Sequence, residues 1–253
     1  MAELTELHSD RHGKLRVAEN CALAMAKSQH VVNLRVTEVA NAVGDFPIFA
    51  TRSAHSRRWS LSAMTSFEPG FNLFVDDDDW LALYQPTIMQ TFPFYLMQAP
   101  GAEKGFSVGI EEGNPAFSAQ HGHCLFDDRG KPSPYLRRVS AALEADVNND
   151  RLTLQFAETL EELGLLKAID LLVTYEDGRI NTIKGLSTVN EDGLKSLPDD
   201  TLAGLHRKGY LLPAHALLMS LFQLNALLRR HNRCGQFAAI RQLKLQVARD
   251  GMA

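Results

Sequence analysis

Short apolar runs separated by turn-forming residues fill the first half of the chain. Four such runs alternate with clusters of Gly, Pro, Asp and Ser, at residues 46–52, 58–67, 92–98 and 105–111. Runs of this length with such boundaries are typical of strands in antiparallel hairpins or a meander. The pattern therefore predicts a strand-rich first half, with one short helix before it at residues 38–43.

Near residues 130–133 the apolar positions change to the three- and four-residue steps of a helix. The steps are clearest at residues 156–163, where the apolar side chains repeat on one face. A long helix is therefore predicted in this part of the chain. Its boundary signals are Ser133 as N-cap with Pro134 after it, a break or bend at Asn148 and Asn149, and a stop at Gly164.

A late hairpin and further helices follow. Apolar runs at residues 169–175 and 180–186 flank "EDGR", in which Gly178 can adopt a positive φ. The later predicted elements are a short helix capped by Asn190, a helix capped by Asp199 or Asp200, a long helix at 213–230 and an amphipathic segment at 235–250.

Strands first and helices later, with one late hairpin, predict the α+β class. The sequence contains no internal repeat, low-complexity tract or obvious linker. We therefore expect one domain over residues 1–253, with a change of layer near 130–133 and a C-terminal extension at 234–253.

Four consecutive aspartates, Asp76 to Asp79, lie between apolar runs at residues 71–75 and 80–84, which we also expect to be strands. A calcium loop of the EF-hand type needs alternating oxygen ligands, a central glycine and a final glutamate, and this segment has none of these in register. Asp is a common turn former, and similar turns are expected at 126–130 and 175–179. We predict a hairpin turn rather than a metal site.

Composition narrows the class of function. The 253 residues carry a net charge of −4, which gives no electrostatic reason to expect nucleic acid as a partner. Three scattered cysteines without a CxxC pair are typical of a reducing compartment. The first residues contain no apolar leader, so we expect a cytoplasmic protein.

One apolar segment, residues 211–228, lacks Asp, Glu, Lys and Arg over 18 positions. Its length is marginal for a membrane span. Pro213, His215, Ser220 and Gln223 lie inside it, and their polar groups would lack partners in lipid. We expect a buried or half-buried core helix and no integral membrane span.

Two histidine segments are candidates for chemistry. "QHGHC" groups His121, His123 and Cys124. These residue types bind metals such as zinc, and two histidines two positions apart on a strand point to one side. A site needs another ligand, which the sequence does not name. We predict an exposed loop without metal, and keep a metal site as the alternative.

The candidate binding residues are His206, Tyr210, His215 and Gln223, in and after "LHRKGYLLPAH". His is the usual general base near neutral pH. On a continuous helix, however, His215 lies in a mostly apolar stripe, which favours a hydrogen-bonded core residue over a catalyst. We assign no catalytic residue.

Arg229, Arg230 and Arg233 cluster near the end of the long predicted helix. Positive side chains suit the helix dipole there, and the same cluster can contact an anionic surface or a partner. The sequence contains no glycine-rich phosphate loop, GxSxG elbow or HExxH motif. We predict no cofactor.

A series of segments in fixed order resembles the SapC-like family. The segments are "FPIFATR", "FEPGFNLFVD", "FPF", "LFDDRGKPSP", "LEELGLL", "LSTVNEDGL" and "LHRKGYL" followed by "AHALLMSLFQL". The resemblance runs from about residue 15 to residue 231. It implies an accessory protein of proteobacteria, often encoded beside TonB-dependent receptors, flavin-dependent halogenase-like proteins and cupin-like proteins.

Three hypotheses of function follow, of which the third is peripheral attachment to a membrane by the C-terminal helix and its arginines. The first is a non-enzymatic, cytoplasmic accessory protein that presents a surface, formed by the long C-terminal helix, to a protein partner or small ligand. The alternative is a metal- or small-ligand-dependent enzyme that uses His121 and His123, or His206 and His215.

Overall fold

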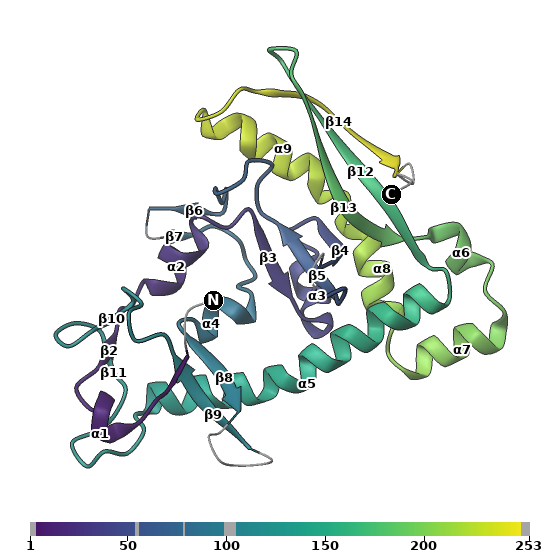
Figure 1. Ribbon diagram of the computed structural model, residues 1–253. Coiled ribbons are helices and arrows are strands. Elements are labelled where there is room, and N and C mark those ends of the chain that lie inside the picture. The colour runs from purple at the N-terminus through teal and green to yellow at the C-terminus, as the bar shows by residue number, and fades with distance from the viewer. Residues whose placement is uncertain (1–3, 54–55, 78, 99–104, 249–253) are drawn as a thin grey trace.

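The computed structural model describes residues 4–53, 56–77, 79–98 and 105–248, and it has the predicted α+β class. Its main sheet is antiparallel, in the order β14-β12-β13-β4-β5-β3 (Figure 1). β13 pairs with β4, so the late hairpin and the early strands share one sheet. The strands are β3 (Val31–Leu34), β4 (Ile48–Arg52), β5 (Trp59–Met64), β12 (Leu166–Tyr175), β13 (Ile180–Val189) and β14 (Ile240–Val247).

These strands confirm four predicted runs, and Gly178 turns the β12–β13 hairpin at φ 88°. β14 comes from the predicted C-terminal extension and pairs with β12 at the edge of the sheet. The extension therefore completes the main sheet.

Two small three-stranded sheets lie near the beginning of the long helix (Figure 1). β8 and β9 confirm two more predicted strands, while the loop between them, residues 99–104, lies outside the described residues. The elements here are β1 (Thr5–Glu6), β8 (Phe94–Gln98), β9 (Phe106–Ile110), β2 (Arg16–Val17), β10 (Phe117–Ser118), β11 (His123–Cys124), α1 (Ser9–His12), α2 (Cys21–Ala26) and α4 (Thr87–Thr91).

Helix α5 (Pro134–Glu162) runs along both regions (Figure 1). Ser133 caps it as predicted, because its Oγ accepts the backbone N–H of Leu136 at 3.1 Å. The break expected at Asn148 and Asn149 is wrong: the helix is continuous there. Its first half packs into the smaller core and its second half into the main core, so burial at both ends outweighs the weak helix propensity of two asparagines.

The aspartate segment forms a hairpin turn, as predicted. β6 (Val75–Asp76) pairs with β7 (Asp79–Trp80), and Asp77 adopts φ 48°; Asp78 lies outside the described residues. The longer strands expected on either side are wrong, because most of residues 71–74 form a buried loop. Asn72 supports this loop by accepting from a local N–H and donating to a distant carbonyl.

Helices cover the C-terminal half. Asn190 caps α6 as predicted, with Oδ1 accepting the N–H of Gly193 at 3.3 Å. Neither Asp199 nor Asp200 caps α7; Pro198 holds the cap position, and both aspartates lie in the first turn, where negative charge suits the dipole. The remaining helices are η1 (Val36–Glu38), α3 (Val39–Ala42), α6 (Glu191–Lys195), α7 (Asp199–Arg207), α8 (Leu211–Ser220) and α9 (Gln223–Cys234).

Candidate functional site

The long helix predicted at residues 213–230 exists, but it is bent into α8 and α9. Leu221 and Phe222 keep helical dihedral angles, and their N–H groups bond to carbonyls three residues earlier. Ser220 is fully buried, and its hydroxyl bonds to Leu217 and to both backbone groups of Ile48. A serine that bonds to its own preceding turn bends a helix, so Ser220 is structural.

By length and composition, residues Leu211–Cys234 could also cross a membrane. A single stretch of this kind is weak evidence, because core helices of soluble proteins share these properties. Here one face of α8 packs against α3, β4 and β13.

The other face of α8 carries large apolar side chains in the open. Leu212, Met219 and Phe222 are 66%, 60% and 72% exposed. With His215 they follow helical steps of three, four and three residues, so they form one line, which we call the α8 stripe. Single exposed apolar residues are ordinary, but an aligned set is typical of an interaction surface.

The predicted site residues do not converge. His206 is exposed on α7, whereas Tyr210 is buried with its ring 5.3 Å from that of Phe156. Burial raises the pKa of Tyr210. His215 is exposed on the α8 stripe, so the expectation of a core histidine is wrong: α8 turns that position away from the sheet. Gln223 begins α9 and lines a groove.

This groove, about 750 Å³ in volume, lies between α9 and the loop at residues 71–76. We call it the arginine groove. Its volume is within the range of ligand pockets, roughly 300–1,000 Å³. The lining includes Gln223, Ala226, Arg229, Arg230, Arg233 and Cys234 on the α9 side, and Asp45, Phe71, Phe74 and Asp76 on the other.

Arg230 has an unusual environment in this groove. Its guanidinium carbon lies 4.4 Å from the centre of the Phe74 ring, and Nη1 donates to the Leu73 carbonyl at 3.4 Å. Burial lowers the pKa of Arg230, because desolvation disfavours the charged form. Within the described part of the chain, neither Arg230 nor its neighbours Arg229 and Arg233 form an ion pair.

The sequence indicated this arginine cluster but not its groove. The opposite wall comes from residues more than a hundred positions away, and no local pattern predicts that contact. The sequence signals for the groove were the cluster of three arginines and Gln223, all on the α9 side.

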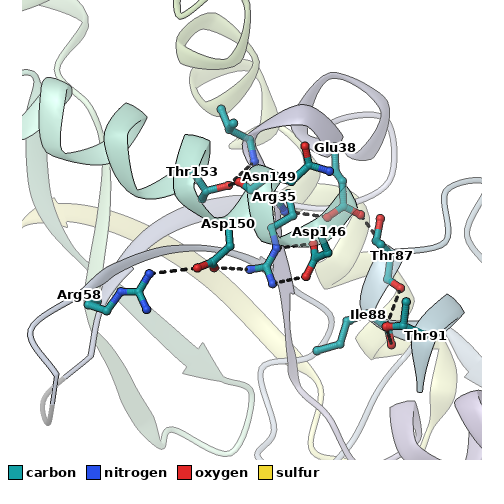
Figure 2. A network of polar contacts seen from close by, with 11 residues as sticks. Arg35, Glu38, Arg58, Thr87, Ile88, Thr91, Asp146, Asn149, Asp150 and Thr153 are labelled. Atoms are coloured by element: carbon teal, nitrogen blue, oxygen red, sulfur yellow. Dashed lines mark hydrogen bonds and ion pairs between the residues drawn. The ribbon is translucent and has the colours of Figure 1, made fainter. Parts of the chain in front are cut away.

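A second polar cluster is fully paired (Figure 2). Nε and Nη2 of Arg35 donate to the two carboxylate oxygens of Asp146, both at 2.6 Å. Nη1 lies 3.0 Å from Asp150, which also accepts from Arg58 at 3.0 Å. The hydrogen bonds to Asp146 are the main cause of a raised pKa at Arg35.

Glu38, 5% exposed, completes this network. It accepts the backbone N–H groups of Arg35 and Thr87, both at 2.7 Å, and the hydroxyl of Tyr84 at 2.8 Å. Burial, and then the bond to Glu38, raises the pKa of Tyr84. The network joins η1, α4 and α5. Because each of the polar groups named here has a partner, we assign the network a structural role.

The histidine segment is exposed, as predicted, and it does not form the pair on one strand that the alternative of a metal site would use. His123 begins β11, whereas His121 lies in the preceding bend. Gly122 separates them at φ 101°, and a Cβ there would lie 1.9 Å from the carbonyl oxygen of Val17. The His123 ring stacks on Tyr135 at 4.7 Å. Among the described residues, no three His, Cys, Asp or Glu side chains form a group that could hold a metal.

The fold and surface define an α+β protein with an exposed apolar helix face and an arginine-lined groove. The chain belongs to the SapC family, whose family model matches residues 7–227. No curated protein and no solved structure matches it. The matched span confirms the resemblance inferred from sequence, and β14 lies beyond it.

Proposed function

We propose that this chain is a non-enzymatic accessory protein of the cytoplasm that binds a protein partner through the α8 stripe. The observation that supports this function is the exposure of Leu212, Met219 and Phe222 on one helix face. Apolar area removed from water contributes about 25 cal/mol per Å², and an exposed aromatic side chain is a common anchor of binding energy.

The expected partner presents a complementary apolar surface with carboxylates beside it, because the stripe is followed on α9 by three arginines that form no ion pair with any residue that the structure describes. Proteins encoded beside SapC-like genes, such as TonB-dependent receptors and halogenase-like flavoproteins, are the first candidates for this role.

Site-specific photo-crosslinking tests the proposal. A benzoylphenylalanine at position 222 should capture a recurrent partner in the native cells. The matched control is the same substitution at Phe106, an exposed phenylalanine on β9 (63% against 72% for Phe222). The purified partner should then bind Phe222→Asp roughly tenfold or more weakly than wild type, and bind Phe106→Asp normally. Identical crosslinks from both positions, or equal affinities, would contradict the proposal.

A further inference from the structure

We propose that the arginine groove binds an extended acidic segment of the partner, with carboxylates at every second position. This inference rests on the proposed function, because the acidic segment belongs to the same partner that binds the α8 stripe and lies next to the part in contact with the stripe.

The α8 stripe leads directly into the arginine groove. Phe222, Ala226, Arg229 and Arg233 follow one another at steps of four, three and four residues, and the backbone stays helical at residues 221–222. These side chains therefore share one helix face. A chain anchored at Phe222 and continuing along α9 meets the arginines in sequence.

Arg230 lacks a directly bonded carboxylate among the described residues. Its charge is partly buried, and its close contacts are one long hydrogen bond to a carbonyl and one aromatic ring, while Asp45 across the groove acts on it through space without forming an ion pair. A guanidinium has five N–H donors, and a buried charge without a carboxylate is unfavourable. A carboxylate in the groove would supply the charge-assisted bonds that this arginine otherwise lacks.

The spacing of the arginines selects the form of the ligand. Arg229 and Arg233 are four residues apart, about 6 Å along a helix that rises 1.5 Å per residue. Alternate residues of an extended chain point to the same side about every 6.6 Å. Carboxylates at every second position therefore match the two arginines, whereas adjacent carboxylates point to opposite sides.

The opposite wall favours separated carboxylates over a compact polyanion. Asp45 and Asp76 line that wall, so a dense negative group that fills the groove would approach them as well. Separated carboxylates can lie along α9 and keep their distance from the two aspartates. This arrangement fixes the orientation of the segment more than it adds affinity.

Fluorescence anisotropy with the full chain tests the inference. The probe is a labelled, end-capped peptide, Phe-Leu-Glu-Ser-Glu-Leu-Ser, and its isomer Phe-Leu-Glu-Glu-Ser-Leu-Ser has the same composition with adjacent glutamates. The first should bind roughly tenfold more tightly than the isomer, and Arg229→Gln with Arg233→Gln should remove that preference. The pair Arg129→Gln and Arg151→Gln, both exposed outside the groove, makes the same charge change and should retain it.

Cys234 gives an independent measurement, because its thiol lines the groove. In a Cys124→Ser background, which removes the exposed thiol, the alternating peptide should slow alkylation of Cys234 and inorganic phosphate should not. Equal affinity for the two isomers, equal protection by phosphate, or a preference unchanged in the double arginine variant would overturn the inference. If the partner crosslinked at Phe222 still binds that variant at full strength, the proposed function stands and the groove assignment fails.

Discussion

Arg35 and Arg230 are both partly buried, but their surroundings differ. Arg35 is bonded by both oxygens of Asp146 and also contacts Asp150, and its pKa is raised. Arg230 faces the Phe74 ring without an ion pair in the described structure, and its pKa is lowered. The first arginine stabilises the fold by joining β3 and η1 to α5, whereas the second lines the groove that we propose as a binding site.

The same contrast holds for the two regions around these arginines. In the network around Arg35 and Glu38, part of which Figure 2 shows, carboxylates and backbone N–H groups are bonded to one another, and the Tyr84 hydroxyl also donates to Glu38. On α8 and α9, apolar and cationic groups face solvent. Polar side chains that have partners within the fold are expected to stabilise it. Aligned side chains that face solvent without such partners are expected to bind another molecule. Substitutions in the network should therefore change stability, and substitutions of the exposed side chains on α8 and α9 should change binding alone.

Glu38→Ala should have the largest effect on stability. The substitution leaves two backbone N–H groups and the Tyr84 hydroxyl without their acceptor in a buried site. We expect the free energy of unfolding to fall by about 3–4 kcal/mol, since bonds to a charged group are strong and orphaned donors are costly. Urea denaturation followed by circular dichroism measures it. Glu162→Ala, at an exposed end of α5, is the matched control and should change stability by about 0.5 kcal/mol or less.

Two substitutions on α8 test the contrast within one helix. Leu217 is 0% exposed, so Leu217→Ala should lower the free energy of unfolding by about 3 kcal/mol through lost burial and a cavity. Met219, two residues later, is 60% exposed, and Met219→Gln should stay within about 0.5 kcal/mol. Thermal and urea unfolding of both variants give the comparison. Similar losses in the two variants would mean that the α8 stripe is part of the core.

Arg35→Met and Arg230→Met test the two arginines directly. Arg35→Met leaves Asp146 without its partner, so we expect the free energy of unfolding to fall by about 2 kcal/mol. This is less than for a fully buried pair, because both side chains are 25% exposed. Arg230→Met breaks no ion pair of the described structure, and the methionine side chain can still contact Phe74. The free energy of unfolding should therefore change by about 0.5 kcal/mol or less. A loss in Arg230→Met equal to that in Arg35→Met would remove the distinction between structural and available arginines.

Local patterns were sufficient for much of the fold. Apolar runs with turn residues predicted β4, β5, β8, β9 and the β12–β13 hairpin, because strand alternation and turn chemistry act over a few residues. The buried loop at residues 71–74 was mistaken for a strand, since its support from Asn72 depends on a carbonyl 46 residues away. The continuous α5 was missed at Asn148 and Asn149 for the same reason: distant packing outweighed local propensity.

The candidate site was harder to predict. His215 and Leu217 lie in one apolar segment, and only packing against β4 and β13 decides which of them faces solvent. The arginine cluster was visible in the sequence, but its groove depends on Phe71 and Phe74, far away in the chain. Sequence therefore indicated the residue types for binding, while the tertiary fold determined which of them share a surface.

The smallest expected effect concerns the pH dependence of the network. Burial and the bond to Glu38 raise the pKa of Tyr84 above the ordinary tyrosine value of about 10. Above that pH the unfolded chain loses the phenolic proton while the folded chain keeps it, so the folded state binds more protons and stability falls as pH rises. Tyr84→Phe removes this contribution. It should lower stability by about 1 kcal/mol at pH 7, through the lost hydrogen bond, and should make the decline above pH 10 shallower than in wild type.

Urea unfolding at a series of pH values measures both effects. Tyr210→Phe is the control, because burial alone raises the pKa of Tyr210 and no carboxylate contributes. Tyr210→Phe should change the slope of stability against pH above pH 10 less than Tyr84→Phe does. At Tyr210 burial raises the pKa, whereas at Tyr84 a hydrogen bond to the Glu38 carboxylate raises it further. Equal slopes in the two variants would mean that Glu38 contributes little to holding the Tyr84 proton. The network would then depend on the backbone bonds of Glu38 to Arg35 and Thr87.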